Sequence, residues 1–147
     1  MGGNAALLLL VESPVPATPR AVELALVAAQ AAADKVARDI VVLDVSDRLV
    51  ITDCFVVCSA PNERQVAAVV EEVERRMRES GVKPVIREGE REARWVLLDF
   101  GDVIVHVQHD EEREFYALER LWKDCPVIPF VDRDLAGRDA EVAQASG

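Results

Sequence analysis

Several residue patterns that mark metal, phosphate or nucleophile sites are missing from this sequence. Its three cysteines form no Cys-x-x-Cys pair, which argues against a zinc site. Cys54 and Cys58 stand four positions apart in a strand-like run, so their Cα atoms would be about 13 Å apart, too far for a disulfide. The sequence has no glycine-rich phosphate loop and no Ser-His-Asp or Cys-His order. We therefore expect no cofactor, no metal and no catalytic residue, and the unpaired thiols, with Cys125, suit a reducing cytoplasm.

Positive charge is scarce, because 17 Lys and Arg stand against 27 Asp and Glu, for a formal charge of -10. Phosphate contacts need an excess of cations, so we expect no sequence-specific binding to nucleic acid. An acidic surface is compatible with a basic protein partner, and equally with ordinary solubility. The apolar run at 5–11 is too short to cross a membrane and lacks the basic flank of a signal peptide. We expect no membrane association and a cytoplasmic location.

The 147 residues are the length of one domain, which we place at 18–131 between a flexible arm at 1–17 and a flexible polar tail at 132–147. Thr18, followed by proline, predicts the start of a helix that runs to about Arg38. The apolar stripe of this helix is expected to comprise Val22, Leu26, Ala29, Ala33 and Val36.

Two strands and a second helix are expected next. The nearly unbroken apolar run at 40–45 is typical of a strand buried on both faces, and 54–59 predicts another strand. Asn62, with Gln65 three residues on, forms a capping box at the start of a helix, and Gly81 marks the end of that helix. Its buried stripe is expected to be Val66, Val69, Val70, Val73 and Met77.

The second half of the chain predicts an edge strand, a hairpin and a third helix. A short run at 84–87 opens with proline and suits an edge strand. Strands at 95–100 and 103–107, joined by a turn that contains glycine, predict the hairpin. Apolar residues at helical spacing predict a helix over 111–122, and 127–131 is expected to lie along the body. Because helices are interspersed with a hairpin, this order predicts an α/β fold with a mixed five-stranded sheet.

The first hairpin strand predicts an unusual surface. Trp95 and Leu97 point to one of its faces, and Val96 and Leu98 point to the other. Both faces are apolar enough to need cover, and three helices do not obviously cover both sides of five strands. An uncovered face carrying Trp95, Leu97 and His106 would be an interaction patch. The alternative is that Trp95 is simply part of the core.

Acidic residues and histidines near the strand ends raise two further alternatives. A nucleotidyltransferase would hold metal ions on a D-x-D pair after a Gly-Ser helix start. No Gly-Ser pair opens the second helix, and the D-x-D at 132–134 lies in the tail. We expect Asp44 and Asp53 to bind loop amides instead. His106 and His109 form H-x-x-H, but residues three apart in a strand face opposite sides, which favours a hydrogen-bonded or partner-facing role for His106.

Three stretches of the chain carry a recognisable signature. They are WVLLDFGDVIVHV at 95–107, with R-x-F-Y-x-L-E-x-L-W after it, ITDCFVVCSA at 51–60, and NERQV at 62–66. In this order and spacing they resemble the ribosomal silencing factor family, also called Iojap-like proteins. Two departures affect loop shape. Ala60-Pro61 stands where many members have small Gly or Ser residues, and Gln108-His109 stands where many have an aromatic.

The resemblance implies a fold, a partner and a mechanism. The fold would be α/β with a mixed sheet, similar in outline to nucleotidyltransferase folds, and without catalysis. The partner would be the large ribosomal subunit, bound through its fourteenth protein, a basic β-rich component on the face that meets the small subunit. Occupying that face would block subunit joining and lower translation under nutrient limitation or in stationary phase. The alternatives are a nucleotidyltransferase-like enzyme and a dimeric adaptor, in which the same patch is buried in a homodimer.

We expect the partner contacts to come from one set of residues around the hairpin. Trp95 and Leu97 would be the desolvated anchors, and Asp99 and Asp102 would meet basic residues. The remaining members would orient the rim or brace the hairpin. The full set is Trp95, Leu97, Asp99, Asp102, His106, Arg113 and Tyr116.

Overall fold

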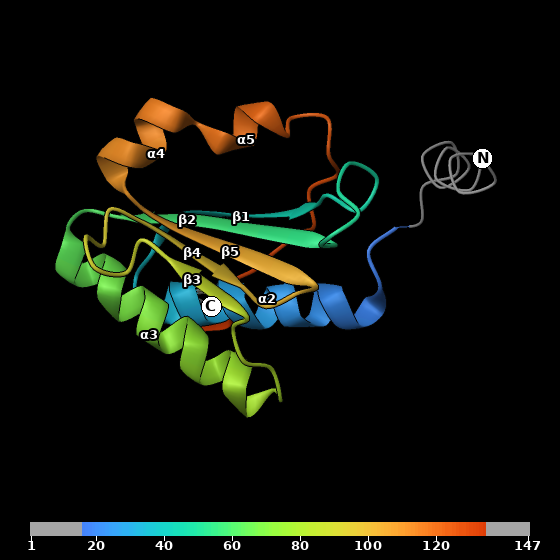
Figure 1. The fold of residues 1–147 in the computed structure, drawn as a ribbon, viewed down its shortest axis with the longest axis horizontal. Coiled ribbons are helices and arrows are strands. Elements are labelled where there is room, and N and C mark those ends of the chain that lie inside the picture. Colours follow the sequence, from blue (N-terminus) through green and yellow to red (C-terminus); the bar gives the residue numbers. More distant parts are fainter. Residues whose placement is uncertain (1–15, 135–147) are drawn as a thin grey trace, which may run out of the picture.

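The computed structural model describes residues 16–134, which form one mixed sheet with helices on both faces (Figure 1). The strands are β1 (Arg38–Asp44), β2 (Cys54–Ala60), β3 (Ile86–Glu88), β4 (Trp95–Asp99) and β5 (Val103–His109). Their order across the sheet is β1-β2-β5-β4-β3. The β2–β5 pair is parallel and the other neighbouring pairs are antiparallel. The predicted mixed five-stranded α/β fold is therefore confirmed.

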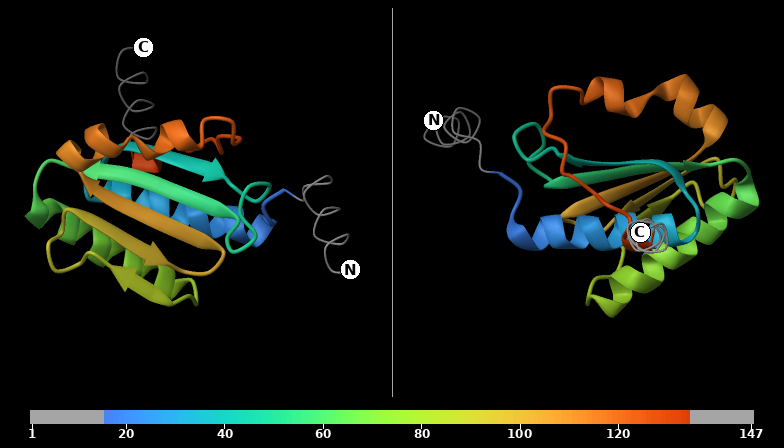
Figure 2. Two further views of the ribbon diagram at one scale, coloured as in Figure 1. Left: turned by 45° about the horizontal axis from the view of Figure 1, so that its top comes forward. Right: turned by 180° about the vertical axis from the view of Figure 1, so that it is seen from behind.

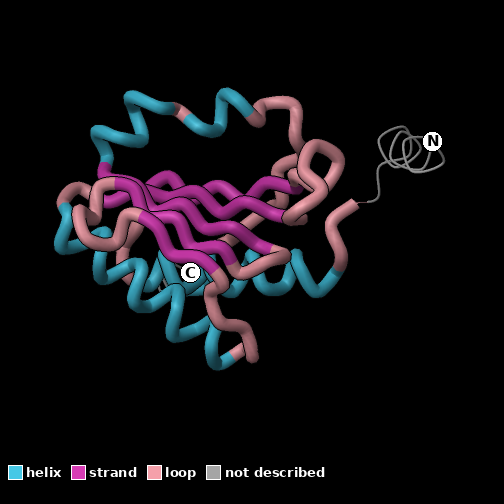
Figure 3. Tube along the Cα trace, viewed as in Figure 1, coloured by secondary structure: helices cyan, strands magenta, loops and turns pink. Residues whose placement is uncertain are grey.

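The helices form two layers, one on each side of the sheet (Figure 1, Figure 3). On one side, which we call the inner face, lie α2 (Pro19–Asp34) and α3 (Glu63–Glu79). On the other side, the outer face, lie α4 (Asp110–Tyr116) and α5 (Leu118–Leu121). The main core fills the space between the inner face and its two helices, and a smaller apolar cluster lies on the outer face. No helix within residues 16–134 is long and apolar enough to cross a membrane.

The second predicted helix, α3, is confirmed. Asn62 Oδ1 accepts the backbone N–H of Gln65 at 2.8 Å, as the cap of a helix does. In a capping box Gln65 would accept the backbone N–H of Asn62. Here Gln65 Oε1 lies 3.5 Å from the side-chain Nδ2 of Asn62 instead. All five residues of the predicted stripe are buried in the main core. Gly81 follows the helix with a φ of 89°, a conformation that glycine adopts without steric cost.

The first helix, α2, differs from the prediction in its length and its buried side. It ends at Asp34 rather than Arg38, and Val36 and Asp39 then adopt positive φ. Its buried residues are Ala21, Leu24, Ala25, Ala28, Ala29, Gln30, Ala31 and Ala32. Ala29 alone is shared with the predicted stripe, and Val36 is 70% exposed. Because this helix has alanine, valine or leucine on every side, the spacing of apolar residues alone does not define which side faces inward. Close packing against the sheet and α3 selects the small alanines.

The prediction of one continuous helix over 111–122 is wrong, because the structure has two short helices there. Ala117 has a left-handed backbone, with φ 45° and ψ 56°, and separates α4 from α5. Neither glycine nor proline marks this position in the sequence. The break turns the chain over the sheet, so that Trp122 packs edge-on against Phe55 with ring centroids 5.2 Å apart. Tertiary packing therefore overrides the local helical spacing.

The first strand, β1, is an edge strand, although its sequence predicts burial on both faces. Val42 nevertheless packs in the main core and Leu43 in the outer cluster, and the C-terminal segment pairs with part of the free edge of β1. Leu43 forms a bridge with Val127, and the Ile128 N–H donates to the Val42 carbonyl at 2.8 Å. The expected packing of 127–131 along the body is confirmed by these contacts.

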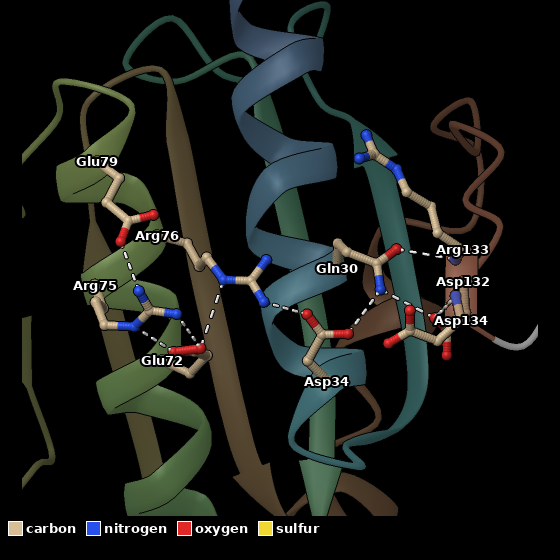
Figure 4. Close-up of polar contacts among 9 residues, drawn as sticks. All are labelled: Gln30, Asp34, Glu72, Arg75, Arg76, Glu79, Asp132, Arg133 and Asp134. Atoms are coloured by element: carbon tan, nitrogen blue, oxygen red, sulfur yellow. Dashed lines mark hydrogen bonds and ion pairs between the residues drawn. The ribbon is translucent and has the colours of Figure 1, made fainter.

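The C-terminal segment is anchored on α2 (Figure 4). The Gln30 side chain donates to Asp132 Oδ1 at 3.0 Å and accepts the Arg133 backbone N–H at 3.1 Å. Gln30 also donates to Asp34, which is ion-paired with Arg76 of α3. These bonds tie the first residues of the predicted tail to the inner helices. The rest of the tail, and nearly all of the predicted N-terminal arm, lie outside the described residues.

The cysteines belong to the packed interior. Cys54, Cys58 and Cys125 are buried free thiols, in agreement with the spacing argument for the first two. Burial raises the pKa of Cys58 to about 12, so this thiol stays protonated and unreactive near neutral pH.

Candidate protein-interaction face

One part of the outer face has no helix over it. α4 and α5 lie over the β1–β2 side of the sheet, and β3 and β4 remain uncovered within the part of the chain that the structure describes (Figure 2, left). The register pairs Ile86 with Asp99 and Glu88 with Leu97. Since alternate residues share a face, we define the open face as Ile86, Glu88, Trp95, Leu97 and Asp99.

The predicted division of β4 between two faces is confirmed. Val96 and Leu98 are 1% and 0% exposed and belong to the main core. Trp95 and Leu97, on the opposite face, are only partly buried, and Ile86 beside them is 45% exposed. Large apolar side chains that face solvent together are typical of an interaction surface.

A row of rings crosses the outer face and supports Trp95. Trp95 of β4 lies 6.2 Å from His106 of β5, and His106 lies 5.0 Å from Phe55 of β2, measured between ring centroids. Phe55 lies 5.2 Å from Trp122, which follows α5. The contacts of Phe55 with its two neighbours are edge-to-face, a geometry that aromatic pairs favour. The row connects the open face to the half of the outer face that α4 and α5 cover.

His106 lies within this row rather than at the surface. Its exposure is 6%, and its Nδ1 accepts the Trp95 Nε1–H at 3.2 Å. Burial lowers the pKa of His106 to about 4, so the imidazole is neutral near pH 7. Of the two roles expected for His106, hydrogen-bonded or partner-facing, the structure shows the hydrogen bond, and the side chain is almost fully buried.

His109, the second member of the H-x-x-H pair, has a separate role. Its Nδ1 accepts the Glu111 backbone N–H at 3.1 Å and caps the start of α4. One histidine thus supports the sheet surface, and the other begins a helix.

A hollow of about 370 Å³ lies beside Trp95, lined by Glu88, Gly89, Trp95 and Leu97. Gly89 is required at its edge. Its φ is 81°, and a Cβ at this position would lie 2.0 Å from the Trp95 carbonyl oxygen. Only glycine therefore allows the two backbones to approach this closely at the edge of the hollow.

Negative charge surrounds the open face. Glu88 and Asp102 are exposed, and Asp99 is half-buried. Asp99 Oδ1 accepts the Gly101 N–H at 2.8 Å, which fixes the hairpin turn that carries Asp102. Glu88 pairs across the strands with Leu97, Asp99 is two residues beyond Leu97 on β4, and Asp102 lies in the turn that follows.

Two arginines beside the open-face residues in sequence, Arg87 and Arg94, are paired with carboxylates. Arg87 Nε lies 2.8 Å from Glu74 of α3, on the inner side of the sheet. Arg94 forms ion pairs with three acids at the starts of α3 and α4, namely Glu63, Glu111 and Glu112. The positive charge of these two arginines is therefore largely balanced.

Arg113 and Tyr116 are not grouped with the open face. Arg113 is 7% exposed and donates from Nη2 to the Asp39 carbonyl at 2.7 Å. It therefore braces α4 against β1. This strand is at one edge of the sheet, and β3 and β4 of the open face are at the other. Tyr116 is the last residue of α4, and its side chain lies outside the described residues.

Two residues of the open face, Ile86 and Glu88, were not anticipated from the sequence. The edge strand predicted at 84–87 is confirmed as an edge but spans Ile86–Glu88. Its pairing with β4 places both side chains beside Leu97 and Asp99. A sequence pattern shows which residues of a strand share a face, but not which strand lies beside it.

Asp44 and Asp53 bind loop amides, as predicted. Asp44 accepts the Ala17 N–H at 3.1 Å and the Ser46 N–H at 3.0 Å, and Asp53 accepts the Thr18 N–H at 2.9 Å. These bonds fix the entry to α2 and the loop after β1.

Three other carboxylates, Asp34, Asp132 and Asp134, have oxygens within 4.8 Å of one another. Asp34 is also bonded to Gln30 and Arg76, and Asp132 to Gln30 (Figure 4). We interpret this group as the anchor of the C-terminal segment, because the Gln30 amide bonds to Asp34 and Asp132 and the Arg76 guanidinium pairs with Asp34.

The fold and the open face together define a small α/β domain with a partly uncovered apolar surface on one side of its sheet. A family model described as "Ribosomal silencing factor during starvation" matches residues 18–146. The chain belongs to this family.

Relatives and a solved structure agree with this assignment. Ribosomal silencing factor RsfS of Bacillus subtilis is 44% identical over 101 residues, which are 69% of this chain and 86% of that protein. A mouse protein, Mitochondrial assembly of ribosomal large subunit protein 1, is 34% identical over 89 residues, 58% of this chain and 39% of that protein. A crystal structure of a Chromobacterium violaceum protein has a TM-score of 0.67 at 36% identity, covering 69% of this chain and 84% of that one.

Proposed function

We propose that this chain is a translational repressor that binds the large ribosomal subunit through its fourteenth protein and blocks subunit joining. Family membership supports a ribosome-associated silencing role, and the name of the mouse relative refers to the large subunit. The observation that carries the proposal is the open face, where Trp95 and Leu97 lie partly exposed on an uncovered part of the sheet.

The chemistry of the open face suits a basic protein surface. Trp95 and Leu97 would be desolvated at the centre of the contact, where aromatic anchors contribute most of the binding energy. Glu88, Asp99 and Asp102 would face lysines and arginines of the partner and accelerate the encounter. The formal charge of -10 disfavours contact with RNA phosphates, which directs binding to protein at a local basic surface.

Repression of this kind needs bulk and occupancy rather than chemistry. The sheet and the layer formed by α2 and α3 stand behind the open face, and α4 and α5 lie on the same side of the sheet as the open face (Figure 1). A bound copy would fill the space through which the small subunit approaches. We infer that the chain acts stoichiometrically, with one copy per large subunit, and not as a catalyst.

Co-sedimentation with purified large subunits, with and without small subunits, tests the proposal. The protein should pellet with large subunits and lower the yield of joined ribosomes in proportion to its occupancy. Protein that stays in the supernatant at micromolar concentration contradicts the binding step. Bound protein that leaves joining unimpaired contradicts the blocking step.

Trp95→Ala locates the contact on the chain. It should weaken binding by about 2 kcal/mol or more, roughly 30-fold, with the fold retained. Val131→Ala is the matched control, because it truncates an apolar side chain that is 70% exposed in the C-terminal segment near α2. The control should bind normally. A folded Trp95→Ala protein with normal affinity would place the contact elsewhere.

A homodimeric adaptor is the alternative, because the same apolar open face can pair with a second copy. Light scattering over a concentration series measures the association. A dimer that Trp95→Ala converts to a monomer, together with no binding to large subunits, would assign the open face to self-association instead.

A further inference from the structure

We propose that His106 is a positioning residue that holds the Trp95 indole in one orientation for partner binding. This inference rests on the proposed function, in which Trp95 is the main anchor. The contact is direct, because Trp95 Nε1–H donates to His106 Nδ1 at 3.2 Å. Trp95 pairs across the strands with Gln108, which makes His106 its diagonal neighbour, within reach of a large ring.

The hydrogen-bond acceptor is itself held still by its surroundings. His106 is 6% exposed, with Leu97 directly opposite on β4 and the Phe55 ring edge-on at 5.0 Å. Phe55 packs in turn against Trp122 at 5.2 Å. The orientation of Trp95 is thus set by rings anchored in the covered half of the outer face. An indole already held in its bound orientation loses less conformational entropy when a partner docks.

The proton arrangement on the imidazole supports this role. Burial lowers the pKa of His106 to about 4, so the ring is neutral near pH 7. A neutral imidazole that accepts at Nδ1 carries its proton on Nε2. His106 Nε2 is buried and has no hydrogen-bond partner within residues 16–134. An unsatisfied buried donor is unfavourable for folding, so an apolar side chain would serve the fold at least as well. The acceptor offered to Trp95 explains why a polar ring is placed there.

Paired substitutions separate positioning from packing. His106→Phe keeps a ring and removes the acceptor, and His106→Leu repeats this change with a smaller side chain. His106→Asn keeps an acceptor oxygen close to the place of Nδ1. Each is made in a Trp122→Phe parent, because the chain has two tryptophans and Trp95 then becomes the sole source of tryptophan fluorescence.

We expect His106→Phe or His106→Leu to melt at or above the temperature of the parent. Trp95 fluorescence in the free protein should show lower anisotropy and faster quenching by acrylamide, because the indole is no longer held. Binding to large subunits should weaken about 3- to 10-fold, the size of one neutral hydrogen bond. His106→Asn should recover most of the affinity and most of the protection from quenching.

The positioning role is wrong if the variants without an acceptor bind as tightly as the parent or leave Trp95 fluorescence unchanged. It is also wrong if His106→Asn recovers nothing. Failure of the proposed function looks different. In that case the parent does not sediment with large subunits, while the His106 variants still alter Trp95 fluorescence in the free protein, so that Trp95 is positioned for another partner.

Discussion

The inner and outer faces of the sheet are constructed from different kinds of side chain. The inner face packs alanines, valines and other small or aliphatic residues against α2 and α3, most of them fully buried. The outer face carries rings and polar groups and is covered over only part of its area (Figure 2, left). Among the described residues, His106 Nε2 and both amide atoms of Gln108 are buried there without a hydrogen-bond partner. Stability is thus concentrated on the inner face, while the outer face accepts an energetic cost in order to present a surface.

Two adjacent leucines of β4 give the most direct test of this contrast. Leu98 is 0% exposed in the main core, whereas Leu97 is partly buried on the open face. Leu98→Ala should lower the free energy of unfolding by about 4 kcal/mol, because it leaves a cavity in a closely packed region. Leu97→Ala should cost about 1 kcal/mol, since it removes a side chain that is only partly buried. Urea denaturation measures both values.

The same pair should show the reverse order in binding. Leu97→Ala should weaken co-sedimentation with large subunits, and Leu98→Ala should retain affinity under conditions where it is folded. Equal losses of stability for the two leucines would contradict the division between the faces.

A second test uses the buried imidazole of the outer face. The pKa of His106 is about 4 in the folded chain, against 6.5 for an unperturbed histidine. The unfolded chain therefore takes up a proton first as the pH falls. The stability that His106 contributes is fully present above about pH 6.5 and is lost on descending towards pH 4, by up to about 3 kcal/mol.

Denaturation midpoints of the wild type and His106→Phe, compared between pH 7 and pH 4, measure this effect. Carboxylates contribute in both proteins, so the difference between the two pH profiles isolates the histidine. The variant should lose about 3 kcal/mol less than the wild type over this range. Parallel profiles would mean that His106 is not the group responsible.

The smallest expected effect concerns the anchor of the C-terminal segment on the inner helices. Gln30→Leu removes the bonds to Asp132 and Arg133 and should destabilise the chain by about 1 kcal/mol. Hydrogen exchange at the Ile128 N–H, which donates to the Val42 carbonyl, should accelerate as the segment loosens from β1. Binding to large subunits should stay unchanged, because the open face is on the other side of the sheet. Weaker binding would show that the two faces are coupled.

The candidate site was predictable where strand alternation alone decides the outcome. That alternation separates Trp95 and Leu97 from Val96 and Leu98, and the structure places them on opposite faces. Arg113 follows the hairpin closely in sequence and is expected to orient the rim or brace the hairpin, but α4 carries its side chain to β1. Proximity in sequence does not show which residues lie together in space once a helix has carried the chain away from the strand before it.

The order of the elements, the hairpin, the capped helix α3 and the two-sided character of β4 follow from local sequence, because they depend on the chemistry of residues close in the chain. Tertiary packing is needed to select the inward side of α2, the break of the last helix at Ala117 and the pairing of β3 with β4. The contacts between strands also place His106 beside Trp95 as its hydrogen-bond partner. These outcomes depend on contacts between segments far apart in sequence, and a packed interior selects one arrangement from several that local patterns allow equally.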